Sequence, residues 1–303
     1  MQSLINKRFS LSGLILNALF DLSPKRTLKL SLRLVSFLSK KKTRPEDRVY
    51  YNLGFNMTIE VEGRHLSGCI WGEGPVLILV HGWMSCSASW KAYISYFVQN
   101  GYQVRAIDAP GHGLNTHQHF DIALYFKAVE HLIKETSNLY AIIGHSIGAT
   151  AAFFGTLENR HISIRKLILI SPYSSLHQLS NEMANFLQLN ENFVEEFDEH
   201  VYSILGRRLA EMEITKHVSL LGSLEIDIIH ADNDPVISQQ ESINITNVSP
   251  DNVALHKVEG TGHAKSHPKV MEQVFDRLPR MPKHYWFPIS TINILPYLHY
   301  ILA

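Results

Sequence analysis

The sequence is poor in cysteine and carries no net charge, and each fact excludes a class of protein. Its only cysteines, Cys69 and Cys86, are too few for a disulfide framework and lack metal-ligand spacing. We expect both to be reduced thiols in a cytoplasm. Lysine plus arginine balance aspartate plus glutamate at 28 each in 303 residues, so no overall field attracts nucleic acid or an acidic substrate.

Long hydrophobic runs and cofactor motifs are also missing. No stretch reaches the roughly 18 apolar residues that a membrane-spanning helix needs. No G-x-x-x-x-G-K-[ST] or G-x-G-x-x-G pattern offers a phosphate cradle, and no H-E-x-x-H pair supports a metal. His112, His117 and His119 lie close together, but we interpret them as part of a polar loop. The sequence therefore implies no cofactor and no metal.

Residues 1–49 form a basic and apolar segment ahead of the main domain. Lys7 and Arg8 precede an apolar stretch at 11–22 that has the look of a signal peptide, but polar residues interrupt it and no small-residue cleavage site follows. In the next stretch, 25–42, leucines alternate with basic residues. We favour an amphipathic segment that packs on the protein; contact with an anionic membrane surface and an N-terminal signal are the alternatives.

From residue 50 onward, short apolar runs alternate with glycine-rich turns and amphipathic stretches of helix length. This rhythm predicts an α/β domain over 50–278, with a mostly parallel twisted sheet and helices on both faces. The stretches Phe55–Val61 and Leu66–Trp71 are expected to form a hairpin. Helices are expected at Ala88–Gln99 and Ile122–Lys134. Further strands are expected at Pro75–Val80, Gln103–Ile107, Leu139–Ile143, Lys166–Ile170, Leu224–Ile229 and Asn252–Val258.

One stretch breaks this rhythm. Between about 172 and 218 only helical patterns occur, with Phe193, Phe197 and Val201 at four-residue spacing. A helical insertion between two strands predicts a cap over the carboxyl ends of the strands; surface helices without a gating role are the alternative. The tail over 279–303 is rich in proline and aromatic residues, and both a docked extension and a flexible appendage fit it.

The strongest chemical signal is a G-x-S-x-G pentapeptide at 144–148, between an expected strand and an expected helix. A serine at such a sharp turn adopts a strained backbone conformation, and glycines two residues away on each side avoid collisions of a Cβ atom. The turn lifts the hydroxyl of Ser146 to the N-terminus of the next helix, where developing negative charge is favoured. Ser146 is therefore the predicted nucleophile.

A serine hydroxyl needs a base, and the base needs an acid that orients it. In the order nucleophile, acid, base, an acid should follow a later strand and a histidine the last strand. His263 lies in a glycine-flanked loop straight after the last expected strand. Asp232 and Asp234 both follow the preceding strand; we favour Asp234, because an apolar residue three positions later can plug the turn, and we assign Asp232 to loop capping.

Acyl transfer also needs an oxyanion hole, because charge develops on the carbonyl oxygen. One N–H group should come from Ile147, the residue after the nucleophile. The other should come from the loop after the strand at 75–80, where His81 and Gly82 precede Trp83. The Trp83 N–H is the first candidate and that of Met84 the second.

Together these motifs resemble the α/β-hydrolase superfamily over about 50–278. The sequences at 81–83, 108–113 and 144–148 resemble its oxyanion loop, the loop after its fourth strand and its nucleophile elbow, while Asp234 and His263 match its acid and base. The N-terminal segment is also similar to that of bacterial hydrolases of unassigned substrate. A haloalkane dehalogenase would need aspartate in place of Ser146, and Ala149 stands where many relatives have glycine.

The resemblance implies hydrolysis through an acyl-enzyme on Ser146, without a cofactor. Apolar residues in the expected cap favour a small or medium carboxylic ester with an apolar acyl group. The same triad also serves amide, thioester and carbon–carbon hydrolases, and a ligand-binding protein without turnover is a further alternative. Substrate identity and oligomeric state lie beyond the sequence.

Overall fold

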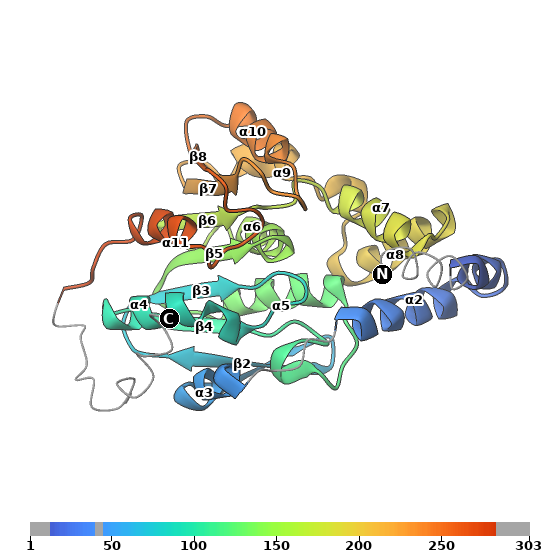
Figure 1. Cartoon of the computed structure of the whole chain (residues 1–303), viewed down its shortest axis with the longest axis horizontal. Coiled ribbons are helices and arrows are strands. Elements are labelled where there is room, and N and C mark those ends of the chain that lie inside the picture. The colour runs from blue at the N-terminus through green and yellow to red at the C-terminus, as the bar shows by residue number, and fades with distance from the viewer. Residues whose placement is uncertain (1–12, 40–44, 283–303) are drawn as a thin grey trace.

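An eight-stranded sheet forms the centre of the protein. The computed structural model describes residues 13–39 and 45–282 (Figure 1). The strand order is β1-β2-β4-β3-β5-β6-β7-β8; β1 and β4 each run antiparallel to β2, and all other neighbours are parallel. The strands are β1 (Phe55–Val61), β2 (Arg64–Trp71), β3 (Val76–Val80), β4 (Gln103–Ile107), β5 (Leu139–His145), β6 (Lys166–Ile170), β7 (Glu225–Ala231) and β8 (Val253–Val258).

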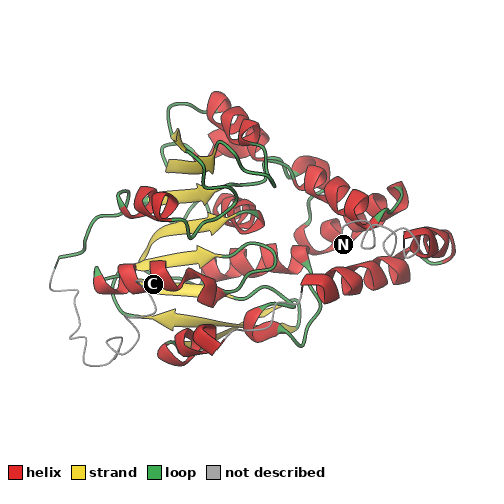
Figure 2. Ribbon diagram, in the orientation of Figure 1, coloured by secondary structure: helices red, strands yellow, loops and turns green. Residues whose placement is uncertain are grey.

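Helices cover both faces of the sheet, as Figure 2 shows. The side chains of β3 alternate between two apolar cores: Val76, Ile78 and Val80 face one, Leu77 and Leu79 the other. Helices α5 (Ile122–Lys134), α6 (Ile147–Glu158) and α10 (Gln239–Val248) contribute to the first core, and α4 (Lys91–Gln99) and α11 (Pro268–Phe275) to the second. The predicted fold class, a mostly parallel sheet between helices, is confirmed.

Most strand boundaries agree with the sequence pattern, and the differences have local causes. Strand β5 continues past Ile143, because Gly144 and His145 still pair with β6. The strand therefore delivers the chain directly to residue 146. The expected helix over 88–99 begins instead as the 3₁₀ turn η1 (Ser87–Trp90) and continues as α4.

A helical layer lies beyond one end of the sheet. It comprises α7 (Leu176–Leu187), α8 (Glu191–Leu205), η3 (Leu209–Glu211), α9 (Ile214–His217) and η4 (Val218–Leu221), all between β6 and β7. Figure 1 shows α2 (Pro24–Ser39) beside this layer, and α2 contacts α8. Phe193 and Phe197 of α8 are fully buried, and Phe20, from the helix over residues 13–22, packs edge-on against Phe193.

The helix α3 (Pro45–Leu53) spans the end of the N-terminal segment and contacts η1 and β1. Within the described ranges, no helix combines the length and the apolarity needed to cross a membrane. The start of the tail lies against the body: the hydroxyl of Tyr102 donates to the Pro279 carbonyl, and the Met281 N–H donates to the Asn100 carbonyl. The expectations for 1–12, 40–44 and 283–303 fall outside the described residues.

Candidate active site

Ser146 occupies a strained turn between β5 and α6. Its backbone has φ of +56° and ψ of −132°, a region that non-glycine residues rarely adopt and that costs about 1 to 3 kcal/mol. The Ser146 N–H donates to the Ile170 carbonyl at 2.9 Å, which ties the turn to the end of β6. The strain therefore persists because the surrounding strand and helix fix the chain on both sides.

The two glycines of the pentapeptide are needed for close packing. A Cβ atom on Gly144 would lie 2.4 Å from the Cα of Ala149, and one on Gly148 would lie 2.3 Å from the His81 carbonyl oxygen. Ala149 is itself fully buried. The sharp turn is thus possible only because the chain has no side chain at these two points.

Asp234 and His263 meet across the loops that follow β7 and β8. The His263 Nδ1–H donates to Asp234 Oδ2 at 2.8 Å. The other carboxylate oxygen, Oδ1, accepts hydrogen bonds from the amides of Val236 and Ile237 at 2.9 and 3.0 Å. Hydrogen bonds on both oxygens leave the carboxylate one orientation, so the imidazole is held in one tautomer.

His230, which the sequence analysis missed, also supports the acid. Its Nε2 lies 3.4 Å from Asp234 Oδ2, and its ring is fully buried. Burial alone would raise the pKa of Asp234, but His230, His263 and the two backbone amides together hold that pKa well below its usual range. His230 ends β7 four residues before the acid; among seventeen histidines that place was too weak a signal.

Asp232 has a different hydrogen-bond partner from Asp234. Its Oδ1 accepts the N–H of Gly260 at 2.9 Å, and Asn233 Oδ1 accepts the N–H of Gly262 at the same distance. These two bonds tie the loop after β7 to the loop that carries His263. The structure thus brings Asp234 to the imidazole and uses Asp232 to hold the loop.

Ser146 and His263 line one cavity of about 450 Å³. The cavity lies at the carboxyl ends of the parallel strands, where ligands bind in open α/β sheets. Glu182 contributes a carboxylate, which accepts the hydroxyl of Tyr173 at 2.9 Å. The remaining lining is mostly apolar and comes from α2, α7, the first residues of α5 and α6, and several loops: Val35, Trp83, Met84, Phe120, Ile122, Ile147, Leu179, Met183, Phe186, Leu187 and Val236.

Comparisons with known proteins concern the fold and the family of the chain. The sequence profile of the family described as Serine aminopeptidase, S33, matches residues 74–216. The solved esterase Pf2001 from Pyrococcus furiosus superposes with a TM-score of 0.54 and 20% identity, over 75% of this chain and 89% of that one. The chain therefore has the α/β-hydrolase fold, and its residues 74–216 are similar to the Serine aminopeptidase, S33, family.

Curated relatives of this hydrolase align over parts of its length. A human Serine hydrolase-like protein is 28% identical over 184 residues, which are 55% of this chain and 87% of the relative. The Bifunctional esterase/perhydrolase DCH of Acinetobacter calcoaceticus is 29% identical over 106 residues, 33% of this chain and 38% of that protein.

In this α/β-hydrolase fold the two candidate oxyanion amides of the loop after β3 differ in their partners. The Met84 N–H donates to His112 Nε2 at 3.1 Å. Trp83 precedes it, lines the cavity and stacks on Phe120 with ring centroids 6.4 Å apart. Ile147, the residue after Ser146, begins α6 and also lines the cavity.

His145 is a second neighbour of the hydrolase's imidazole that sequence reasoning did not single out. Its Nε2–H donates to the His263 carbonyl at 3.2 Å, and the two ring centroids are 4.8 Å apart. Burial, then the nearby Lys265 and His263, hold the pKa of His145 well below its usual value. The residue occupies a variable position of the pentapeptide, so the sequence offered no signal for it.

No metal cluster accompanies these histidines among the residues that the structure describes, since no three His, Cys, Asp or Glu side chains there could share an ion. His112 bonds to the backbone of two loops, and His117 lies within hydrogen-bonding distance of Gln118.

Proposed function

We propose that this protein is a serine hydrolase that works through an acyl-enzyme. Ser146 is the nucleophile, His263 the base, and Asp234 the acid that orients the base. The observation that carries the proposal is the 2.8 Å bond from His263 Nδ1 to Asp234, beside a cavity that Ser146 also lines. Because Nδ1 donates to the acid, Nε2 is the nitrogen free to accept a proton.

In the proposed reaction the Ser146 Oγ attacks the substrate carbonyl while its proton passes to His263 Nε2. The tetrahedral intermediate collapses, the bond to the leaving alcohol breaks, and the imidazolium returns its proton to that alcohol. Water, activated by the same base, then attacks the acyl-enzyme. This step releases the carboxylic acid product and restores the hydroxyl of Ser146. Asp234 stays ionised throughout, in keeping with its lowered pKa.

We assign the oxyanion hole to the N–H groups of Trp83 and Ile147. The engagement of the Met84 N–H by His112 supports Trp83 over Met84. Ile147 lies at the N-terminus of α6, where backbone N–H groups are unpaired and the helix dipole favours negative charge. Such donors contribute about 10²- to 10³-fold each to kcat in enzymes of this mechanism.

The proposed substrate is a carboxylic ester of small or medium size with an apolar acyl group. The size of the cavity and its mostly apolar lining support an acyl chain. The comparison with an esterase/perhydrolase supports ester chemistry, whereas a thioesterase domain from the curacin pathway has the same fold at 15% identity and a TM-score of 0.50. Amide, thioester and carbon–carbon bonds therefore remain the alternative substrates for this triad.

Turnover and labelling test the proposal together. The parent should hydrolyse p-nitrophenyl esters and react with a fluorophosphonate probe, and Ser146→Ala should abolish both. Turnover that survives Ser146→Ala would remove the mechanism. A parent that binds esters but is neither labelled nor active would indicate a ligand-binding protein instead.

We further propose that the N-terminal segment contacts an anionic membrane surface on its cytoplasmic side. The helix over residues 13–22 exposes Leu14, Ile15 and Leu22 at 65%, 54% and 81% of their surface. Acidic side chains of α8 line a groove with the buried Phe20, and none of these three exposed side chains lines that groove. The next helix, α2, exposes four basic side chains: Lys25, Arg26, Lys29 and Arg33.

Apolar side chains beside cations are typical of helices that lie in the membrane interface. Binding to phosphatidylglycerol-containing vesicles should therefore exceed binding to phosphatidylcholine vesicles and weaken with salt. Replacing Leu14, Ile15 and Leu22 by serine should reduce it, and so should Lys25→Glu with Lys29→Glu. Binding that ignores lipid charge and both sets of substitutions would refute the contact.

A further inference from the structure

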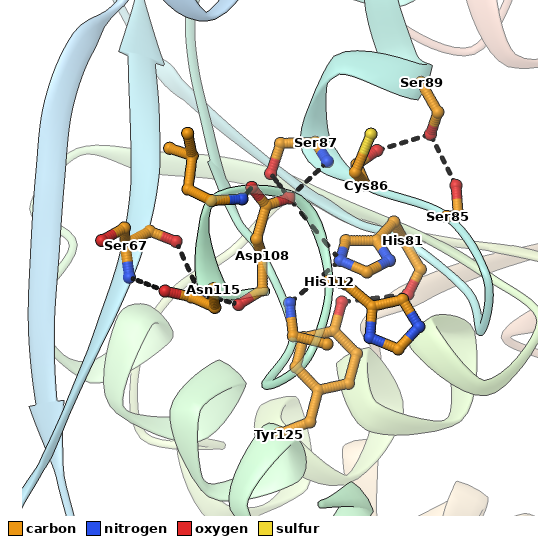
Figure 3. Close-up of polar contacts among 12 residues, drawn as sticks. Ser67, His81, Ser85, Cys86, Ser87, Ser89, Asp108, His112, Asn115 and Tyr125 are labelled. Atoms are coloured by element: carbon orange, nitrogen blue, oxygen red, sulfur yellow. Dashed lines mark hydrogen bonds and ion pairs between the residues drawn. The ribbon is translucent and has the colours of Figure 1, made fainter. Parts of the chain in front are cut away.

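Two histidines cross-link the loops that follow β3 and β4. His81, from the first loop, accepts the Ala109 N–H of the second on its Nε2 at 3.0 Å. His112, from the second loop, accepts the Met84 N–H of the first on its Nε2 at 3.1 Å. The two ring centroids are 5.7 Å apart, and Figure 3 shows the rings side by side. We call this pair the histidine clasp.

The backbone fixes the tautomer of each ring. His112 Nδ1–H donates to the Pro110 carbonyl at 3.0 Å, and His81 Nδ1–H donates to the Gly82 carbonyl at 2.7 Å. Each Nε2 therefore presents a lone pair to the opposite loop. Burial lowers the pKa of His112 and brings that of His81 to about 3, so both rings stay neutral acceptors near neutral pH.

The clasp acts on a strained part of the chain. Met84 has φ of +56°, a conformation that residues with a Cβ hold only when their surroundings enforce it. Ser87, three residues after Met84, donates both its N–H and its hydroxyl to Asp108, at 2.6 and 2.8 Å, as Figure 3 shows. The loop is thus held at the Gly82 carbonyl, at Met84 and at Ser87, so Trp83 lies between fixed points.

We propose that His112 is a positioning residue for the oxyanion hole: its Nε2 holds the Met84 N–H and so fixes the backbone that presents the Trp83 N–H to the substrate. This role rests on the proposed function, because it matters only if charge develops on a carbonyl oxygen. His112 touches neither the substrate nor Ser146 in this scheme; it acts through Met84.

A purely space-filling role for His112 is the competing explanation, since its ring packs edge-on against Phe120 at 5.1 Å. Two variants separate the roles. His112→Gln is long enough to offer a carbonyl oxygen near the place of Nε2, whereas His112→Leu fills space without an acceptor. Both remove the imidazole, so any difference between them reports the hydrogen bond to Met84.

The experiment compares the parent and both variants after counting functional serines by end-point fluorophosphonate labelling. Per labelled site, His112→Leu should lower kcat by roughly 10²-fold with little change in KM, because a misplaced donor fails mainly in the transition state. His112→Gln should stay within about tenfold of the parent. Amide hydrogen exchange at Met84 should be faster in His112→Leu than in His112→Gln.

The outcomes are distinguishable. A His112→Leu variant with the kcat of the parent, or a His112→Gln variant as slow as His112→Leu, overturns the positioning role. A loss confined to the number of labelled sites indicates misfolding and overturns it as well. If the parent shows no turnover that depends on Ser146, the proposed function has failed and the catalytic role of the clasp with it, while the exchange rates still report whether His112 holds Met84.

Discussion

Replacing Asp234 by asparagine tests the triad at the atom where its geometry is best defined. The amides of Val236 and Ile237 both donate to Oδ1, so an asparagine must keep its carbonyl oxygen there. Its NH₂ group then takes the place of Oδ2, which in the parent accepts from His263 at 2.8 Å. Two donors would face each other, so the imidazole must move its proton from Nδ1 to Nε2.

The wrong tautomer cannot accept the proton of Ser146, although every atom stays close to its place. The corresponding aspartate-to-asparagine change in a serine protease lowers kcat by about 10⁴-fold. This loss is equivalent to about 5.5 kcal/mol in the activation barrier. We therefore expect Asp234→Asn to lower kcat by about 10⁴-fold, with KM near that of the parent, in a p-nitrophenyl ester assay.

Asp232→Asn is the matched control. Its Oδ1 accepts the Gly260 N–H, a bond that an asparagine can preserve, so its kcat should stay close to that of the parent. The reasoning would be refuted by an Asp234→Asn enzyme within about tenfold of the parent. It would equally be refuted if both substitutions lowered kcat to the same extent.

Three further changes test packing, electrostatics and specificity. Gly148→Ala places a Cβ 2.3 Å from a backbone oxygen and should abolish ester turnover. Gly206→Ala has open space around its Cβ but a φ of +67°, so it should lower the free energy of unfolding in urea by only about 1 kcal/mol. Asp227 of β7 forms ion pairs with Lys166 and Arg277, which outweigh its burial and lower its pKa. These ion pairs therefore stabilise the fold above about pH 4 and are lost as the pH falls through the folded pKa. Asp227→Asn should therefore cost about 2 kcal/mol in urea unfolding at pH 7, and the cost should shrink towards pH 3; an equal cost at both would contradict this. Val35→Phe should shift kcat/KM towards shorter acyl chains, because Val35 lines the cavity; an unchanged chain-length profile would remove α2 from the substrate site.

The sequence predicted the parts of the site that depend on the ends of strands. Ser146, Asp234 and His263 each follow a strand, and the carboxyl ends of parallel strands share one edge, so the strand pattern, together with the pentapeptide and the order nucleophile, acid, base, predicted that their loops meet. The sheet itself was predictable for the same reason. Its alternating strands and helices leave few topologies once crossovers are right-handed.

The missed residues act between loops. His112 and His230 contact backbone and side-chain groups that the sequence pattern does not place near them, so no local spacing marks them. Val35 of α2 is another residue of the site that the sequence pattern did not mark. The amphipathic pattern of 25–42 predicts that one face of a helix is buried, but it does not say that this face lines the cavity beside Ser146.

Burial explains why one of the neighbouring histidines, and not another, is suited to be the base. His81 and His145 are almost fully buried, and burial lowers the pKa of each, so neither takes up a proton readily. The His263 side chain is 19% exposed and donates to the Asp234 carboxylate, which in the proposed reaction stabilises the imidazolium that forms when Ser146 loses its proton. The same low-dielectric surroundings thus keep His81 and His145 neutral as hydrogen-bonding groups, whereas His263, which is partly exposed and bonded to Asp234, is the imidazole to which the proposed reaction assigns proton transfer.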